Sequence, residues 1–163
     1  MPVTLSVLEL IAVELERRLK TLAVGSTYDT KLSEVIRPKR LETFTPKHLQ
    51  VILTQGPSER IDELSYPGNP PAIAYRQTFN IRCHVMPSER SCEAVDKIIN
   101  QMRADIISVV CTPQADWYQF DGQSIDAAFE SEEPILSEGI DGINLPIAIV
   151  YRTDENDPYT RRA

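Results

Sequence analysis

The sequence is poor in the residues from which catalytic and metal sites are usually built. Its 163 residues include two histidines, three cysteines and six glycines. The cysteines, Cys83, Cys92 and Cys111, show no CxxC spacing, whereas a structural metal site needs three or four convergent ligands. The glycines form neither a GxGxxG pattern nor a Walker loop. We therefore expect no metal and no cofactor, and we interpret the cysteines as small buried hydrophobic residues.

A nucleophile activated by a base is also hard to assemble from this sequence. No GxSxG turn surrounds a serine. His84 alternates onto the polar side of a predicted strand, so we expect an exposed strand residue there. Glu132 and Glu133 are adjacent and precede a proline, which favours solvated charges over an acid–base pair. The sequence gives no support for an enzyme.

No apolar run approaches the about 20 residues that span a bilayer. The first 18 residues have acids within their apolar stretch and no basic leader, so we expect no signal peptide and a protein kept in the cytosol. The composition, 42% hydrophobic and 25% charged, is that of one soluble globular domain.

Positive charge is missing from one long stretch. Between positions 121 and 141 there is no Lys or Arg, and the acids found there account for the whole net charge of −7. These acids are Asp121, Asp126, Glu130, Glu132, Glu133, Glu138 and Asp141. Proteins that hold nucleic-acid phosphates need clustered basic side chains, so specific DNA binding is not expected. The stretch is either a solvated acidic loop or a surface that repels phosphates.

One segment alternates in character almost without interruption. In residues 72–85, AIAYRQTFNIRCHV, one row of side chains is apolar except for Gln77. The other row is polar and contains Arg76, Thr78, Asn80, Arg82 and His84. This period predicts a β-strand of roughly 45 Å with one buried and one wet face. Because that length exceeds a small core, we expect the polar row to contact something outside the subunit.

The remaining pattern predicts two helices and several shorter strands. Apolar spacing and a Ser6–Glu9 capping box indicate a helix over residues 5–22. A second helix should begin after Ser88 and end before Pro113. Strands are expected over residues 32–38, 48–55, 117–120, 127–131 and 143–152, with a turn at 121–122. Pro146 cannot donate to a ladder, so the last strand should lie at an edge or be bulged.

Two polar segments complete the prediction. Residues 56–71 hold four prolines and two glycines and are predicted as a loop, either a plain surface excursion or a contact element. Residues 153–163 lack periodicity and are predicted as a polar tail ordered against a partner. The fold class is therefore α+β: a single domain, residues 1–152, with two amphipathic helices on one face of a mostly antiparallel sheet of four to six strands.

Four segments together carry a resemblance to a known family. They are the N-terminal helix, the proline-rich segment leading into PPAIAYRQTFNIRCHVMP, the helix SERSCEAVDKIINQMRADII, and the closing LPIAIVYRTDENDPY. The residues that contribute most are Tyr151, Arg152, Asp157, Pro158 and Tyr159. Over nearly its whole length the chain resembles the tail terminators, or tail-completion proteins, of long-tailed bacteriophages.

The resemblance implies a structural virion protein, assembled in the host cytoplasm, that forms a six-fold ring. Such a ring caps the full-length tail tube and joins it to the head connector or stopper. Its partners would be further copies of itself, the tube protein, the sheath protein where the tail has one, and the connector; there would be no membrane partner. DNA would pass through the lumen without specific binding, along the acidic residues. Contacts with a neighbouring subunit or partner would involve Tyr151, Arg152, Asp157, Pro158, Tyr159, Arg161 and Arg162.

Other interpretations stay open at this point. The nearest is a different neck protein of similar size, such as a connector or stopper subunit. A second, of another class, is a small cytosolic adaptor that binds one protein partner through a sheet edge. An enzyme is a third.

Overall fold

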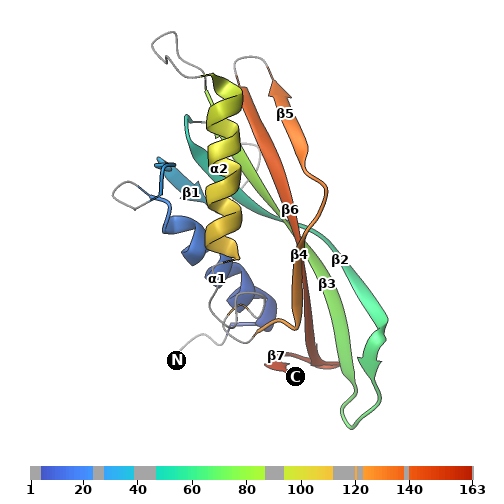
Figure 1. Cartoon of the computed structure of the whole chain (residues 1–163). Coiled ribbons are helices and arrows are strands. Elements are labelled where there is room, and N and C mark those ends of the chain that lie inside the picture. Colours follow the sequence, from blue (N-terminus) through green and yellow to red (C-terminus); the bar gives the residue numbers. More distant parts are fainter. Residues whose placement is uncertain are drawn as a thin grey trace.

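The structure, a computed structural model, describes residues 5–23, 28–38, 47–86, 94–111, 120, 123–137 and 140–162. Two helices and seven strands are formed in these residues (Figure 1). In chain order they are α1 Val7–Lys20, β1 Glu34–Ile36, β2 Gln50–Tyr66, β3 Ala72–Val85, α2 Val95–Val110, β4 Asp126–Phe129, β5 Glu133–Ser137, β6 Ile140–Asp154 and β7 Asp157–Arg161.

All seven strands belong to one sheet in the order β1-β2-β3-β6-β4, with β5 and β7 also paired to β6. Only β1 and β2 are parallel. Both helices lie on one face of this sheet (Figure 1), which we call the inner face; the opposite face is the outer face. The predicted two-layer α+β fold is confirmed, with seven strands instead of four to six.

The core lies between the helices and the inner face. From β3 it takes the apolar row that includes Phe79, Ile81 and Cys83, and from β6 the row around Ile147 and Ile149. The alternation predicted for residues 72–85 is therefore confirmed on its apolar side. Cys83 is fully buried, and burial raises the pKa of its thiol well above the ordinary value. Cys111 is half-buried, and Cys92 lies outside the described residues.

Helix α1 begins as the sequence predicts. The Ser6 hydroxyl accepts the backbone N–H of Glu9 at 3.2 Å, which satisfies one of the donors that a helix leaves unpaired at its start. At the other end, the buried Arg18 binds Glu14 and donates to the carbonyl of Val110 at 2.8 Å, and its guanidinium lies 4.7 Å from the Phe120 ring centre. This one side chain joins the two helices.

The predicted start of α2 is not reproduced. The described helix begins at Val95, with Ala94 in the cap position and no side-chain cap. Ser88, proposed as the cap, lies outside the described residues, as do the turn at 121–122 and residues 117–119 of the strand predicted over residues 117–120. Phe120 itself is fully buried, with a positive φ of 44°.

Pro146 does not place β6 at an edge, because β6 pairs with β3 on one side and with β4 and β5 on the other. The Pro146 carbonyl accepts the N–H of Glu130 at 2.8 Å. A strand residue directs its N–H and C=O to the same side, so the missing N–H would also have faced this neighbour. The interruption between β4 and β5, at residues 130–132, lies opposite the proline. The irregularity that Pro146 demands is therefore taken up by the partner strand.

Two segments predicted as irregular are paired strands. Residues 56–66, placed in a loop by the sequence, form the second half of β2, and only residues 67–71 turn. Residues 153–162, predicted as a tail, form the end of β6 and β7, which fold back as a hairpin. Proline misled the first prediction: Pro57 lies at a register shift between Gln55 and Ser58, where no ladder donor is needed.

Candidate interaction surface

The most distinctive feature of the fold is a β-hairpin that runs past the helices (Figure 1). We call it the arm: residues 56–66 of β2, the turn 67–71 and residues 72–77 of β3. Strand β1 pairs only with residues 50–52 of β2. Among the described residues, β2 therefore has no strand partner on its outer edge from Leu53 to Tyr66. Such an edge presents backbone donors and acceptors to another chain.

The arm joins the body at a bulge that Gln77 stabilises. Gln77 is the polar exception in the apolar row of β3, and its side chain is buried. Its amide nitrogen lies 2.9 Å from the carbonyl oxygen of Gly56, 3.2 Å from that of Pro57 and 2.8 Å from that of Thr78. The bulge in β2 turns carbonyls away from their ladder partners, and the amide donates to them. This interruption of the sequence pattern therefore marks the base of the arm.

The end of the arm is stabilised in a similar way. A second register shift separates Ile61 from Tyr66. There the Ser65 hydroxyl accepts the N–H of Ala74 at 3.0 Å and donates to the carbonyl of Ile61 at 2.8 Å. Arg152 of β6 donates to the carbonyl of Leu64, and its guanidinium lies 5.1 Å from the Tyr66 ring centre. The tip is thus held to the sheet while Leu64 and Tyr66 remain 39% and 43% exposed.

The polar row of β3 lies on the outer face but is not one uniform contact surface. Arg76 is exposed and binds Glu130 at 2.6 Å, across the intervening strand β6. Thr78 and Asn80 are half-buried, and Arg82 is exposed. His84 contradicts the expectation of an exposed residue: only 7% of it is accessible. Burial and the nearby Arg82 charge lower the His84 pKa, so its neutral form is favoured.

The acidic residues do not form a single patch. Glu130 pairs with Arg76 on the outer face, whereas Glu132 binds Arg103 of α2 at 2.6 Å, on the helix side. Strand register determines the face on which the other described acids lie, because paired residues point to the same face of a sheet. Asp126 and Glu133 share the outer face, and Asp141 shares the inner face with the core residue Val85. Asp121 and Glu138 lie outside the described residues.

The C-terminal residues named by the resemblance gather at the level of the arm. Tyr151 is buried and stacks on Tyr75, with ring centres 5.7 Å apart. Burial raises the Tyr151 pKa. In β7, Asp157 accepts the N–H of Tyr159 at 3.0 Å and the hydroxyl of Thr160 at 2.6 Å, which lowers the Asp157 pKa. Pro158, Tyr159 and Arg161 are exposed, and Arg162 pairs with Asp154.

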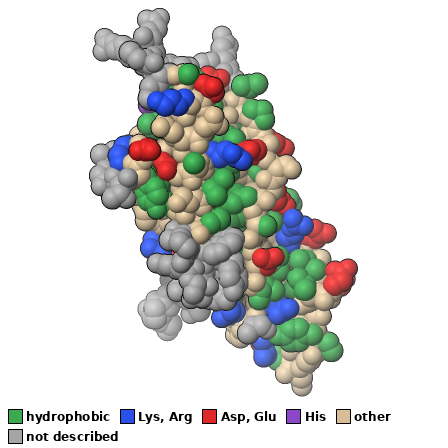
Figure 2. All heavy atoms as spheres, in the orientation of Figure 1, with side chains coloured by type: hydrophobic (Ala, Val, Ile, Leu, Met, Phe, Trp, Pro, Cys, Tyr) green, Lys and Arg blue, Asp and Glu red, His purple; other side chains and the backbone are tan. Residues whose placement is uncertain are grey.

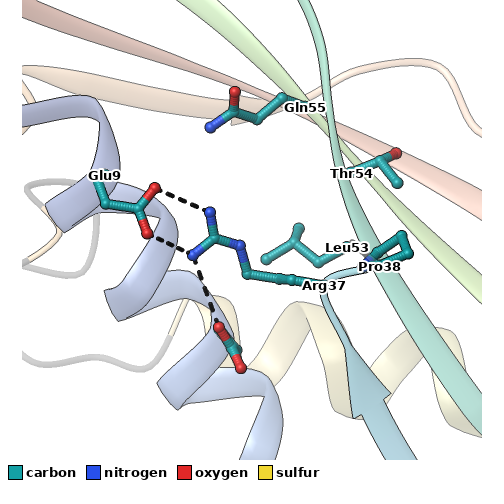
Figure 3. A pocket seen from close by; sticks show the side chains of 7 residues that line it. Glu9, Arg37, Pro38, Leu53, Thr54 and Gln55 are labelled. Atoms are coloured by element: carbon teal, nitrogen blue, oxygen red, sulfur yellow. Dashed lines mark hydrogen bonds and ion pairs between the residues drawn. The ribbon is translucent and has the colours of Figure 1, made fainter. Parts of the chain in front are cut away.

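A hollow of about 700 Å³ lies between α1 and the free edge of β2 (Figure 3). Arg37, just after β1, reaches across it to bind both carboxylate oxygens of Glu9 at 2.8 and 3.0 Å, with Glu16 at 3.8 Å. This pairing lowers the Glu9 pKa and raises that of Arg37. The charges in this hollow bind one another, so the arrangement ties a strand end to a helix.

The described residues offer little chemistry beyond such pairing. They contain no group of three His, Cys, Asp or Glu side chains placed to hold a metal ion. No helix in the described part of the chain is long and apolar enough to cross a membrane. The surface features of the described residues are the arm, its unpaired edge and the hairpin of β6 and β7.

Sequence reasoning missed the arm because neither of its faces in β2 is covered. Ser58, Glu59 and Arg60 are all exposed, so no hydrophobic period identifies this strand. Gln77 was the signal that could have revealed it, since a buried amide in an apolar row needs polar partners. The Glu9–Arg37 pair had no sequence signal, because the two residues are 28 positions apart.

Comparison with known proteins adds no relative. No protein-family model matches the chain, and no curated protein matches it.

Proposed function

We propose that the chain is a structural virion protein, a tail terminator whose copies form a ring, with six members expected. The observation that carries this proposal is the arm: a long hairpin projecting beyond the core, with a free edge and a tip exposing apolar residues. The β2 half of this hairpin is largely exposed and gains little from intramolecular burial, so contact with another subunit explains its length.

In this proposal the ring closes the tail tube and presents its other side to the head connector. Its partners are further copies of the chain, the tube protein, the sheath protein where one exists, and the connector or stopper. The C-terminal hairpin, with exposed Tyr159 and Arg161, is offered to one of these neighbours.

A narrower part of the proposal concerns the lumen. Asp126, Glu130 and Glu133 share the outer face, so these are the acids that we propose to face DNA. Arg76 offsets the charge of Glu130 at 2.6 Å. The surface would then be weakly acidic, which suits a duplex that slides without specific binding.

The decisive experiment compares tails assembled with and without the protein by electron microscopy. Tubes of uncontrolled length in its absence support termination, and tubes of normal length without it refute the proposal. Sizing separates the alternatives: about six subunits favours the terminator, twelve-fold symmetry favours a connector, and a monomer that never joins a tube end favours an adaptor.

A further inference from the structure

Two surfaces at opposite edges of the sheet lie at the same level. Register places Tyr66 of β2 beside Ala72 of β3, Ala72 beside Asp154 of β6, and Asp154 beside Asp157 of β7. The arm tip and the β6–β7 hairpin are therefore the two ends of one row across four strands. Figure 1 shows them on opposite sides of the lower sheet. Copies placed side by side in the same orientation would bring the arm of one next to β7 of the next.

Each surface carries an exposed charge that forms no ion pair in the described residues, and these charges have opposite signs. The β2 part of the arm carries Glu59, Asp62 and Glu63 and one base, Arg60, which binds Asp62 at 2.7 Å. Within the described residues, Glu59 and Glu63 form no ion pair. Strand β7 ends in the exposed Arg161, which likewise forms no ion pair in the described part of the chain. Opposite charges that form no ion pair with the described residues of their own copy can pair between copies, which fixes register and speeds association.

Both surfaces also expose apolar side chains. Leu64 and Tyr66 protrude from the arm, where Figure 2 shows hydrophobic groups interspersed with charged ones, and Tyr159 of β7 is 55% exposed. A hollow of about 330 Å³ lies beside β7, with the Tyr75 and Tyr151 rings and Pro158 among its walls. Its size suits one or two side chains, and its aromatic lining suits apolar ones.

We propose that the arm of one copy docks on the β6–β7 hairpin of the next, with Leu64 and Tyr66 against Tyr159 and Glu63 near Arg161. The contact joins two different surfaces, so it is heterologous and generates rings or filaments rather than closed dimers. It is made by side chains, because Pro158 has no N–H and the Tyr159 N–H already binds Asp157. This inference rests on the proposed ring and names the interface that builds it.

Disulfide trapping tests the contact directly. Leu64→Cys and Tyr159→Cys are combined in one full-length chain and oxidised. Within one copy the two positions are separated by about three strand spacings, roughly 14 Å, whereas a disulfide needs Cα atoms within about 7 Å. Bonds must therefore form between copies, and we expect a ladder of covalent multimers. Leu64→Cys with Val13→Cys, an exposed position on α1, is the matched control and should give no ladder.

A charge exchange gives a second, independent measurement. Glu63→Lys and Arg161→Glu should each weaken self-association roughly 2- to 30-fold, measured by sedimentation velocity at low salt. The double variant should recover most of the loss, because the pair is restored with its signs exchanged. Recovery cannot be explained by misfolding of either single variant.

Failure of this inference and of the ring proposal can be told apart. Suppose that the protein is oligomeric, but the Leu64→Cys, Tyr159→Cys chain gives no covalent ladder and the double charge variant does not recover self-association. The proposed interface is then refuted, and the ring proposal stands. If the chain remains a monomer at every concentration and never joins a tube end, both are refuted.

Discussion

Replacement of Gln77 tests whether the arm depends on the bulge at its base. The Gln77 side chain is 3% exposed, and its amide nitrogen is within hydrogen-bonding distance of three carbonyl oxygens. A primary amide has two N–H groups, so at most two of these bonds form fully at once. Gln77→Met preserves length and apolar contact but removes both donors. We expect stability to fall by about 2 kcal/mol, the usual cost of unsatisfied buried polar groups.

Urea denaturation measures this loss. With a slope of about 2 kcal/mol per molar urea, the midpoint should fall by about 1 M. Gln55→Met is the matched control, because Gln55 lies on the same strand face beside the bulge but is exposed. Its midpoint should stay within about 0.2 M of the parent value. A Gln77→Met midpoint equally close to the parent would refute the role assigned to the amide.

Gln77→Glu separates hydrogen bonding from shape. The carboxylate is similar in size but has no donor and faces carbonyl oxygens, so at pH 7 this variant should be less stable than Gln77→Met. Protonation restores one donor, so the difference between the two variants should narrow as the pH falls. A Glu variant as stable as the parent at pH 7 would contradict the assigned hydrogen bonds.

Three further predictions concern the body of the domain. Gly142→Ala should cost about 3 kcal/mol or more, measured by thermal unfolding, because the added Cβ would collide with the Cys83 carbonyl of the adjacent strand; an unchanged midpoint would disprove this close approach. The lowered Glu9 pKa predicts a contribution to stability that is present above the unfolded carboxyl pKa of about 4.3 and is lost as the pH falls through the folded pKa. Arg37→Met should reduce this pH dependence when the free energy of unfolding is measured at a series of acid pH values. The same pH dependence in the parent and in Arg37→Met would count against the ion pair. The lowered His84 pKa predicts that stability decreases as the pH falls below about 6.5. His84→Gln should remove that slope, whereas the exposed control His48→Gln should leave it; a slope that survives His84→Gln would contradict this assignment.

The parts of the fold that follow a hydrophobic period could be predicted from sequence. The stripe of α1 and the alternation of β3 each place their apolar residues in the core, as expected. The prediction failed where burial does not follow the local pattern. His84 occupies a polar position on β3 yet is 7% exposed. In the sheet it lies between Gln50 of β2 and Gly142 of β6. Burial of that kind depends on neighbours distant in the chain.

The candidate surface was only partly predictable for the same reason. The excess length of β3 was visible in the sequence, and it suggested contact outside the subunit. The second half of its partner strand β2 could not be predicted, because residues 56–66 are largely exposed on both faces and contain a proline at a bulge. The acidic residues were visible as a run, but strand register and ion pairs with Arg76 and Arg103 divide them between two faces.

By itself, the sequence determined that two amphipathic helices cover one face of a sheet containing a very long strand, because burial there follows periods of 3.6 and 2 residues. Only the tertiary structure decided what that long strand does. Pairing with β2 makes its first half one side of the arm, Gln77 holds the bulge at the base, and pairing with β6 sets the arm tip level with β7. These relations join residues far apart in the chain through backbone hydrogen bonds. Every residue except proline can both donate and accept such bonds, so no local pattern of side chains specifies them.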